Sequence, residues 1–458
     1  MKYNNIYKLA ALFTLMVIAG CNKYLDVTPK GKQLLKSTSD YNLWLNSAFL
    51  DFENDAQNLD YLADDIDNPT LTASSTAVND LIYTWATQFL ANITIEPPIW
   101  GDHYTSIYYY NTVLVGIDTA AGSTQQGAQL KAEALLGRAF EYLYLINLYA
   151  KEYDSATAAQ DLAVPFVTAI DISTTTPPRS TVQALYNQII TDLNAAIPNL
   201  PVSNGTDRYR GSVAAAYSVL ARAYLYMRNY TAAETSAQNA LKADNTLSLL
   251  NYTTFTNVGS LPNQVTSTES IYARQSENPV YYPTQSFLKT FDTTDARLSL
   301  FYYSYDNNYN TVKPDYSFSQ RGVVMFVNGN YQPNVGTTVA EMELIIAEGA
   351  ARSGDLTTAL TALNTVRTNR FPNYIAYTSN NKDTVLQKVL SERTFEFPFS
   401  AIRWFDMRRL NKEGRIPGIN RYDNTGNIIA TLAPSSPRYV LQIPLAVLKF
   451  NPGMQQNP

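Results

Sequence analysis

The residue types that carry most enzyme chemistry are scarce in this sequence. His103 is its single histidine and Cys21 its single cysteine, so a zinc site built from these residues lacks ligands. No serine stands in a G-x-S-x-G turn, and no glycine-rich phosphate loop occurs. Asp306-x-Asn308-x-Asn310 begins like a calcium loop but lacks the later glycine and glutamate, so we interpret it as a polar turn. We therefore expect no cofactor, no metal site, and a packed or surface position for His103.

An acidic segment contains the one pair of residues that suggests hydrolysis. Asp64 and Asp65 are adjacent, with Asp60 and Asp67 on either side. Two convergent carboxylates can cleave a glycosidic bond. A solvated acidic loop is the plainer interpretation, and both alternatives stay open at the level of sequence.

The composition indicates a chain with extensive contact surfaces. Tyrosine occurs 34 times, against 18 phenylalanines and 4 tryptophans, while only 16% of residues are charged. Tyrosine combines an apolar ring with a hydroxyl group, so it serves contact surfaces as well as cores. The formal net charge is −5 and becomes −7 if residues 1–20, which contain Lys2 and Lys8, are removed. An acidic chain without a basic run argues against nucleic acid and anionic lipid surfaces as partners.

The first residues predict export and lipidation. Lys2 and Lys8 precede the apolar stretch Leu9 to Gly20, which is shorter than the roughly 20 residues of a membrane-spanning helix. Small residues then precede Cys21, as at the cleavage site of a bacterial lipoprotein signal. We expect residues 1–20 to be a signal peptide and 21–38 a lipidated tether. Two or three acyl chains on Cys21 would anchor the protein stably.

Two stretches predict the helical scaffold that positions the rest. In residues 213–245, small and bulky side chains follow the offsets of a tetratricopeptide helix pair: Tyr217, Leu220, Ala221, Tyr224, Ala233 and Ala237. The same offsets recur after residue 341, with Gly354-Asp355 at the turn. One such hairpin cannot bury its apolar face alone. We therefore predict a mainly α fold: a tetratricopeptide-like repeat scaffold with an irregular, loop-rich region that contains short strands.

The remaining sequence divides around these repeats. Further helices are predicted from Ser39 to Phe52, from near Trp100, from Leu130 to Tyr149, from Ser180, and from Lys382 to Leu410. Residues 251–338 are rich in Thr, Asn, Ser, Pro and Tyr and have no long helical period. We expect an N-terminal helical region at 39–250, a ligand-binding loop region at 251–338, and a C-terminal helical region at 339–458.

Three sequence blocks carry a family resemblance. The first is Cys21 to Gly31, CNKYLDVTPKG. The second is Val339 to Asp355, where Glu341, Leu344, Ala347 and Glu348 match R-Y-x-E-x-x-L-x-x-A-E, although Thr338 replaces its arginine. The third is ERTFEFPFSAIRWFDMRR, in which Ser400 replaces a glutamate and these residues match: Glu392, Arg393, Glu396, Arg403, Trp404, Asp406 and Arg409. In combination the blocks resemble the SusD/RagB family, the surface lipoproteins that Bacteroidetes pair with TonB-dependent transporters for glycan uptake.

The resemblance implies glycan binding without turnover and a SusC-like TonB-dependent transporter as partner. It also implies a lipid-anchored position on the outer membrane, facing the cell surface. Sugar rings offer apolar faces to aromatic side chains and hydroxyls to polar ones. Candidate ring platforms are Trp85, Tyr281, Tyr282, Tyr302, Tyr303, Tyr305, Tyr309 and Tyr316. Candidate hydrogen-bonding residues are Asp64, Asp65, Asn68 and Arg321.

The acids and arginines of the second and third blocks have a structural interpretation. Their spacing allows pairing within and between helices around Trp404, which favours a buried ionic network over a catalytic group. Glu341 is assigned to this network with the matched residues of the third block.

Two other functions remain open from the sequence. A lipoprotein with tetratricopeptide repeats can be a scaffold that grips protein or peptide. An α-helical glycoside hydrolase would need two acids in the same cleft as the aromatic rings. Of the three, non-catalytic glycan binding agrees best with the loop-rich middle and the third block.

Overall fold

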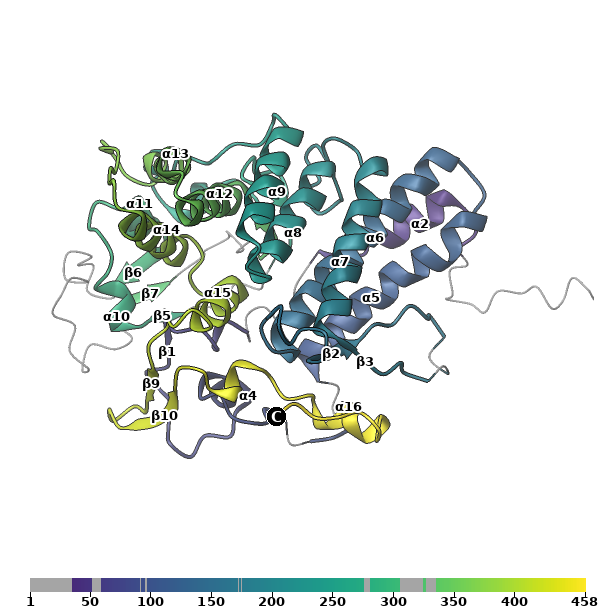
Figure 1. The fold of residues 1–458 in the computed structure, drawn as a ribbon, viewed down its shortest axis with the longest axis horizontal. Coiled ribbons are helices and arrows are strands. Elements are labelled where there is room, and N and C mark those ends of the chain that lie inside the picture. Colours follow the sequence, from purple (N-terminus) through teal and green to yellow (C-terminus); the bar gives the residue numbers. More distant parts are fainter. Residues whose placement is uncertain are drawn as a thin grey trace, which may run out of the picture.

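The structure is a computed structural model that describes residues 35–51, 59–90, 92–94, 97–171, 173, 175–275, 281–304, 324–326 and 335–458. The described part is mainly helical, which confirms the predicted fold class (Figure 1). Its α-helices are α2 (Thr38–Leu45), α4 (Val78–Tyr83), α5 (Pro98–Gly116), α6 (Thr124–Tyr149), α7 (Val182–Ala196), α8 (Val213–Tyr226), α9 (Tyr230–Ala243), α10 (Gln285–Leu288), α11 (Ala296–Phe301), α12 (Val339–Ser353), α13 (Leu356–Thr368), α14 (Lys382–Glu396), α15 (Ala401–Asn411) and α16 (Leu445–Phe450). Short 3-10 helices are η1 (Ala48–Leu50), η2 (Ile117–Thr119), η3 (Ile197–Asn199), η4 (Tyr252–Thr254), η5 (Val258–Ser260) and η8 (Pro437–Tyr439).

The strands form short antiparallel pairs that fasten loops to the helices. The pairs are β1 (Ile66–Asp67) with β5 (Tyr282–Pro283), β2 (Leu162–Pro165) with β3 (Arg179–Thr181), β4 (Ser270–Tyr272) with β8 (Thr337–Thr338), β6 (Tyr302–Ser304) with β7 (Val324–Phe326), and β9 (Ile419–Tyr422) with β10 (Ile428–Leu432). In the first pair, Ile66 lies opposite Pro283 and Asp67 opposite Tyr282. A loop of the N-terminal half is thereby joined to the loop-rich middle.

Helical hairpins form one continuous stack. Each neighbour packs on the next in the order α5, α6, α7, α8, α9, α12, α13, and Figure 1 shows them running from the right of the molecule to its upper left. The repeat positions Ala221, Ala233 and Ala237 are buried in the first hairpin, as are Ala347 and Leu363 in the second. Small side chains at these positions let the helices approach closely, as the repeat spacing predicts.

Local sequence explains where the two hairpins begin and end. The side chains of Ser212 and Asn229 cap the N-termini of α8 and α9, and Thr338 caps that of α12. Gly354 ends α12 with φ of 96°, a left-handed conformation that glycine adopts most easily. Asp355 then caps α13 directly, so the turn between the two helices is tight.

The chain leaves this stack and returns to it. Helix α9 ends at Ala243 and α12 begins at Val339, yet the two helices pack side by side. Gly349 of α12 lies so close to α9 that an added Cβ would stand 3.0 Å from the Tyr230 carbonyl oxygen. The loop-rich segment between the helices therefore starts and ends at neighbouring points of the scaffold.

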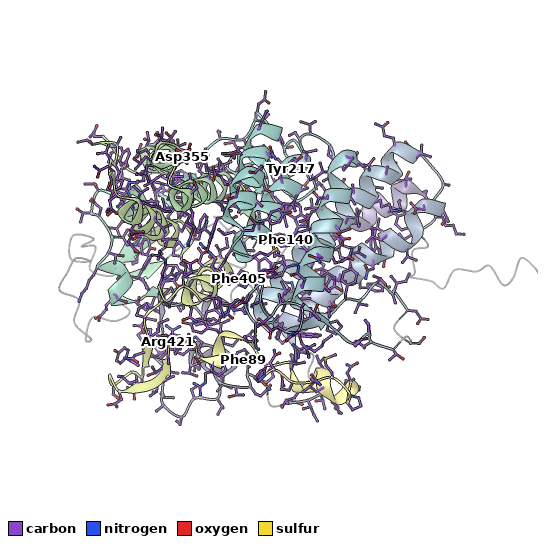
Figure 2. All side chains as sticks on the ribbon, in the orientation of Figure 1. Phe89, Phe140, Tyr217, Asp355, Phe405 and Arg421 are labelled. Atoms are coloured by element: carbon purple, nitrogen blue, oxygen red, sulfur yellow. The ribbon has the colours of Figure 1, made fainter. Side chains whose placement is uncertain are left out.

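Three hydrophobic cores support the described part of the structure, and the smallest packs α2 against α5 and α6. The largest core follows the stack and includes Phe140 and Phe405, both labelled in the interior of Figure 2. The second is strongly aromatic and gathers Phe287, Tyr302 and Phe399 from the loop-rich and C-terminal regions. This second core underlies the surface formed by β1, β5 and α10.

One predicted helix is divided. Residues 382–410 form α14 and α15 with a break at 397–400. Pro398 disfavours a helical conformation at the preceding residue, and Phe399 has φ of 50°. The predicted first helix also ends early: α2 stops at Leu45 and η1 follows.

Candidate glycan-binding site

A polar cleft opens where three distant segments meet. Its volume is ≈ 650 Å³, and it lies between the acidic segment that contains β1, the segment that contains α10, and the segment that contains β9. Figure 1 shows these elements together at the lower left of the molecule. The lining residues are Asp64, Asp67, Tyr83, Thr284, Gln285, Ser286, Lys289, Pro417, Gly418, Ile419, Asn420, Arg421 and Tyr422.

Arg421 joins β9 to the acidic segment and to α4. The side chain is buried, and its guanidinium donates to four backbone carbonyl oxygens at 2.6 to 3.1 Å, those of Tyr61, Ala63, Ile66 and Tyr83. The guanidinium carbon also lies 4.0 Å from the centre of the Tyr83 ring. A residue of β9 thereby fixes the backbone of the acidic segment and of α4 (Figure 2).

Asp64 is paired, not solvated. Its two carboxylate oxygens each accept a 2.7 Å hydrogen bond from Arg403 of α15. Burial by itself raises the pKa of this carboxyl, but the guanidinium of Arg403 outweighs burial and holds the pKa below its usual range. Asp64 is therefore a charged, oriented residue of the cleft wall.

Asp65 and Asp60 lie behind the wall. Asp65 accepts the backbone N–H of Phe399 at 2.8 Å, and Asp60 accepts the hydroxyl of Tyr281. Burial, together with the neighbouring charge of Asp64, raises the pKa of Asp65 to about 7. Burial likewise raises the pKa of Asp60. The interpretation of this segment as a solvated loop is wrong, because buried donors from two other regions fold it inward.

Three predicted ring platforms are core residues. Trp85 is 2% exposed, and its indole N–H donates to the Leu62 carbonyl at 2.9 Å. Tyr281 and Tyr302 are each 1% exposed and belong to the aromatic second core, where Tyr281 stacks on Phe399. The prediction that these three rings are open to a sugar is wrong, since packing and hydrogen bonds cover them.

Other predicted ligand residues keep some exposure or lie elsewhere. Tyr282 is half-buried on β5, and Tyr303 is 41% exposed on β6. Asn68 is half-buried and donates to Asp80 at 2.7 Å. The structure brings Asp64 to the cleft but does not include Tyr282, Tyr303 or Asn68 in its lining. Outside the described residues lie Cys21, Tyr305, Tyr309, Tyr316 and Arg321.

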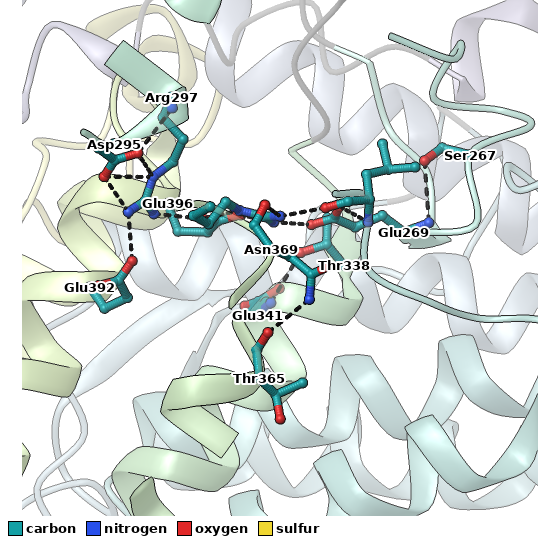
Figure 3. Close-up of polar contacts among 12 residues, drawn as sticks. Ser267, Glu269, Asp295, Arg297, Thr338, Glu341, Thr365, Asn369, Glu392 and Glu396 are labelled. Carbon is teal, nitrogen blue, oxygen red and sulfur yellow. Dashed lines mark hydrogen bonds and ion pairs between the residues drawn. The ribbon is translucent and has the colours of Figure 1, made fainter. Parts of the chain in front are cut away.

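The residues assigned to a structural network lie in buried ion pairs. Figure 3 shows Arg297 beside Glu392, at 2.6 Å, and beside Glu396, at 2.8 Å. Glu396 also pairs with Arg370, which reaches Glu269 of the loop-rich region at 2.6 Å. This cluster ties α14 to segments far away in the sequence.

A second cluster follows α15. Asp406 bridges Arg393 and Arg409, at 2.8 and 2.7 Å, and Arg409 continues to Glu348 of α12 at 2.6 Å. The two arginines hold the pKa of the Asp406 carboxyl at about 2 although burial raises it. Trp404 is fully buried and stacks on Tyr439. Glu341 pairs separately with Arg222, and both side chains are fully buried.

A second groove differs in chemistry from the cleft. It has a volume of ≈ 640 Å³ and lies between α5 and α16, lined by Trp100, Tyr104, Tyr108 and Phe450 among others. Its described lining residues carry no charged side chain. Trp100 is 7% exposed, whereas Tyr108 is 39% exposed.

Comparison with protein families identifies the chain. A family profile described as "Starch-binding associating with outer membrane" matches residues 23–225, and the profile of the SusD family matches residues 339–458. The chain belongs to the SusD family. The match confirms the resemblance drawn from the sequence blocks, and the second profile covers two of them. No curated protein sequence matches the chain significantly.

Solved structures share the fold of this SusD-like chain. A SusD superfamily protein from Bacteroides thetaiotaomicron aligns with a TM-score of 0.73 at 21% identity, over 92% of this chain and 100% of its own. A SusD-like carbohydrate binding protein from Bacteroides vulgatus has a TM-score of 0.69 at 20% identity, over 92% and 97%. A surface glycan-binding protein A from Bacteroides uniformis has a TM-score of 0.70 at 18% identity, over 92% and 99%.

Membership of the SusD family argues against the alternative of a glycoside hydrolase. SusD-family glycan-binding proteins are non-catalytic, in agreement with the prediction that this chain is not an enzyme. The geometry agrees too, because Asp64 is neutralised by Arg403 and Asp65 is buried, so the two do not form an exposed acid and base. In the part of the chain that the structure describes, no three His, Cys, Asp or Glu side chains form a group that could hold a metal, and no helix is long and apolar enough to span a membrane.

Sequence reasoning missed most of the cleft of this SusD-like protein. Asn420, Arg421 and Tyr422 stand in a short strand that shows no helical or alternating pattern. Gln285 and Lys289 lie in and just after a helix of one turn. The one signal in the sequence was composition, since the loop-rich segment and the C-terminal residues are rich in amide side chains and tyrosines. Only the fold brings these residues opposite Asp64.

Proposed function

We propose that this protein captures an oligosaccharide or polysaccharide at the cell surface and passes it, unchanged, to a SusC-like TonB-dependent transporter in the outer membrane. The observation that carries the proposal is the polar cleft, in which the half-buried Tyr422 lies among amide and hydroxyl side chains from three segments. An aromatic face beside amides and hydroxyls matches the apolar faces and the hydroxyl groups of sugar rings.

Weak binding is expected of such a site. An aromatic side chain that covers a sugar with half of its surface contributes roughly 2 kcal/mol at about 25 cal/mol per Å². The entropy lost on association offsets much of this gain, so we expect micromolar to millimolar affinity. A receptor that must release its ligand to a transporter benefits from fast dissociation, and neighbouring copies on one surface can supply avidity.

The anchor and the transporter are parts of the same proposal. The lysines and apolar stretch before Cys21 support lipidation at that residue, and the matching family is described as associating with the outer membrane. Radiolabelled palmitate should enter the full-length chain and fail to enter the Cys21→Ala variant. A transporter should copurify with the tagged chain from outer membranes; labelling of Cys21→Ala, or purification of the chain alone, contradicts these two points.

Affinity electrophoresis tests glycan capture. Soluble protein beginning at Asn22 is run through native gels that contain neutral and acidic polysaccharides. We expect one polymer to retard the protein, Tyr422→Ala or Asn420→Ala to abolish the retardation, and no sugar to be released. Tyr108→Ala is the matched control, since this tyrosine is exposed but lies in the other groove. Retardation that survives Tyr422→Ala and is lost in Tyr108→Ala contradicts the assignment to the cleft.

A further inference from the structure

The charges around the cleft indicate what kind of glycan it accepts. Among its described lining residues, Asp64, Asp67, Lys289 and Arg421 carry formal charges, two of each sign. We infer that the cleft selects uncharged glycans and excludes acidic ones, because the guanidinium groups in and beside it already have partners and most of its lining is uncharged. This inference rests on the proposed function.

Arg421 cannot act as an anion receptor in this conformation. An arginine that binds a carboxylate or sulfate presents a fork of N–H donors to it. The nitrogens of Arg421 instead donate to four carbonyl oxygens, and aromatic rings lie beside the guanidinium: the centre of the Tyr83 ring is 4.0 Å away and that of the Trp85 ring 4.4 Å. An anionic sugar could bind this side chain only by displacing contacts that hold the cleft together.

The second arginine near the cleft is occupied as well. Arg403 donates through two nitrogens to the two oxygens of Asp64, at 2.7 Å each. Asp67 accepts the hydroxyl of Tyr83 at 3.0 Å and the N–H of Asn68 at 2.9 Å, so it keeps its acceptor character on the wall. An incoming carboxylate or sulfate would therefore meet guanidinium N–H groups that already have partners, next to the carboxylate of Asp67.

The remaining lining groups suit hydroxyls. Thr284, Gln285, Ser286 and Asn420 are uncharged and offer amide or hydroxyl groups. Lys289 is exposed at the edge, where solvent and salt weaken the attraction of a single charge without removing it. Uncharged sugars can exchange hydrogen bonds with such groups, whereas an anion loses hydration without gaining a buried cation.

The test compares one polymer in two charge states. Neutral polymers (amylopectin, galactomannan, xyloglucan and arabinan) and acidic ones (polygalacturonate, alginate and chondroitin sulfate) are cast in native gels with the soluble chain that begins at Asn22. The neutral polymer that retards the protein is then oxidised at its primary alcohols to uronates and cast again. We expect the neutral form to retard the protein and the oxidised form to have little effect.

Two variants should weaken this preference by increasing the retardation caused by the oxidised polymer. Ser286→Lys adds a cation at an exposed lining position and leaves the buried pairs intact, so retardation by the oxidised polymer should rise by about two- to fivefold. Asp64→Asn should do the same by releasing Arg403, and its circular dichroism and melting temperature report whether it folds. Ser286→Gln is the uncharged control and should not restore binding of the oxidised polymer.

The outcomes separate the inference from the function on which it rests. Retardation by acidic polymers alone, or equal retardation by both forms of one polymer, overturns the charge selection and leaves glycan capture standing. Retardation by no polymer overturns both. A Ser286→Lys variant that folds and gains no binding of the oxidised polymer also overturns the inference.

Discussion

Arg222 and Glu341 form a buried ion pair on which the stability of this fold should depend. Both side chains are fully buried, and Arg222 donates to the two oxygens of Glu341 at 2.8 and 2.6 Å. The guanidinium also donates to the Val335 carbonyl at 3.2 Å. Such a pair favours one arrangement of the core over others, because either side chain without its partner would be an unpaired charge in the core.

Removing one member of this pair should destabilise the protein strongly. We expect Glu341→Ala to lower the free energy of unfolding by about 3 to 5 kcal/mol, measured by urea denaturation. The double variant Arg222→Met with Glu341→Leu should recover much of that loss, since no isolated charge remains. Lys131→Ala is the control: its pair with Asp118 is solvent-exposed, with 40% and 66% of the side chains accessible, and its loss should be about 0 to 1 kcal/mol. A single variant as mild as this control contradicts the prediction.

Asp65 should make stability depend on pH. Burial raises the pKa of its carboxyl from 3.8 to about 7 in the folded protein, so folding favours the protonated form. Its contribution is therefore complete below about pH 4 and is lost as the pH rises toward 7. The free energy of unfolding should fall over that interval by at most roughly 4 kcal/mol, and Asp65→Asn should remove this component.

The measurement is the difference between the two proteins at each pH. Burial also raises the pKa of Asp51 to about 6 and that of Glu343 to about 7, so other groups titrate in the same window. Urea titrations of the parent and of Asp65→Asn from pH 4 to 8 cancel these shared groups. Parallel curves would show that Asp65 does not bind a proton in this range.

For single residues, the sequence predicts that a side chain forms an ion pair better than it predicts a partner from a distant part of the chain. The spacing of Arg393, Asp406 and Arg409 predicts ionic pairing, because Asp406 pairs with Arg393 of the preceding helix and with Arg409 three residues later. Asp64 and Trp85 could not be assigned in the same way. Their partners, Arg403 and Arg421, lie more than three hundred residues away, and no local pattern records such contacts.

The helical hairpins are the elements that the sequence predicts best. Their pattern of small residues must recur at fixed offsets because each helix packs mainly against the next one in the stack. The strands of the loop-rich middle are the opposite case. Each is two or three residues long; β4 pairs with β8, β6 with β7, and β5 with β1 of the N-terminal half, so their pairing depends on the finished scaffold.

Close packing of α5 against α6 should be sensitive to a single methyl group. A Cβ at Gly137 would overlap the ring of Tyr110, whereas one at Gly127, on the same helix, would meet Thr38 Cγ2 at an ordinary 3.7 Å. We expect Gly137→Ala to lower the free energy of unfolding by about 1 to 3 kcal/mol. Gly127→Ala should be neutral or raise it by up to about 1 kcal/mol, since alanine favours helix. Equal effects in urea denaturation would contradict this difference.

Over the whole molecule, the last residues fasten the C-terminal tail to the end of α6 and to β3. Asn457 donates to the carbonyls of Tyr149 and Leu441, at 2.9 and 2.7 Å, and accepts from Arg179 at 2.7 Å. The tail thereby covers the C-terminal end of α6, where Leu441 also donates to the Leu148 carbonyl at 2.9 Å.

Asn457→Ala should loosen this closure. We expect a loss of about 1 to 3 kcal/mol, because buried carbonyls and a guanidinium lose their partner. Hydrogen exchange should accelerate at Leu441 more than in α8. Gln455→Ala is the matched control, an exposed side chain in the same tail whose removal should change neither measurement. An identical exchange rate at Leu441 in both variants contradicts the role given to Asn457.

The neighbouring positions of Ala243 and Val339 have a consequence for how such proteins diversify. Since α9 and α12 pack against each other directly, the residues between them can lengthen, shorten or be exchanged between related genes without separating the two hairpins. Mutations in that interval can then change the contacts to ligand, while selection for folding acts mainly on the flanking repeats. A chimaera that carries the interval of a relative should keep the thermal stability of its host and acquire the ligand contacts that the interval supplies, whereas those of Asn420 and Tyr422 stay with the host.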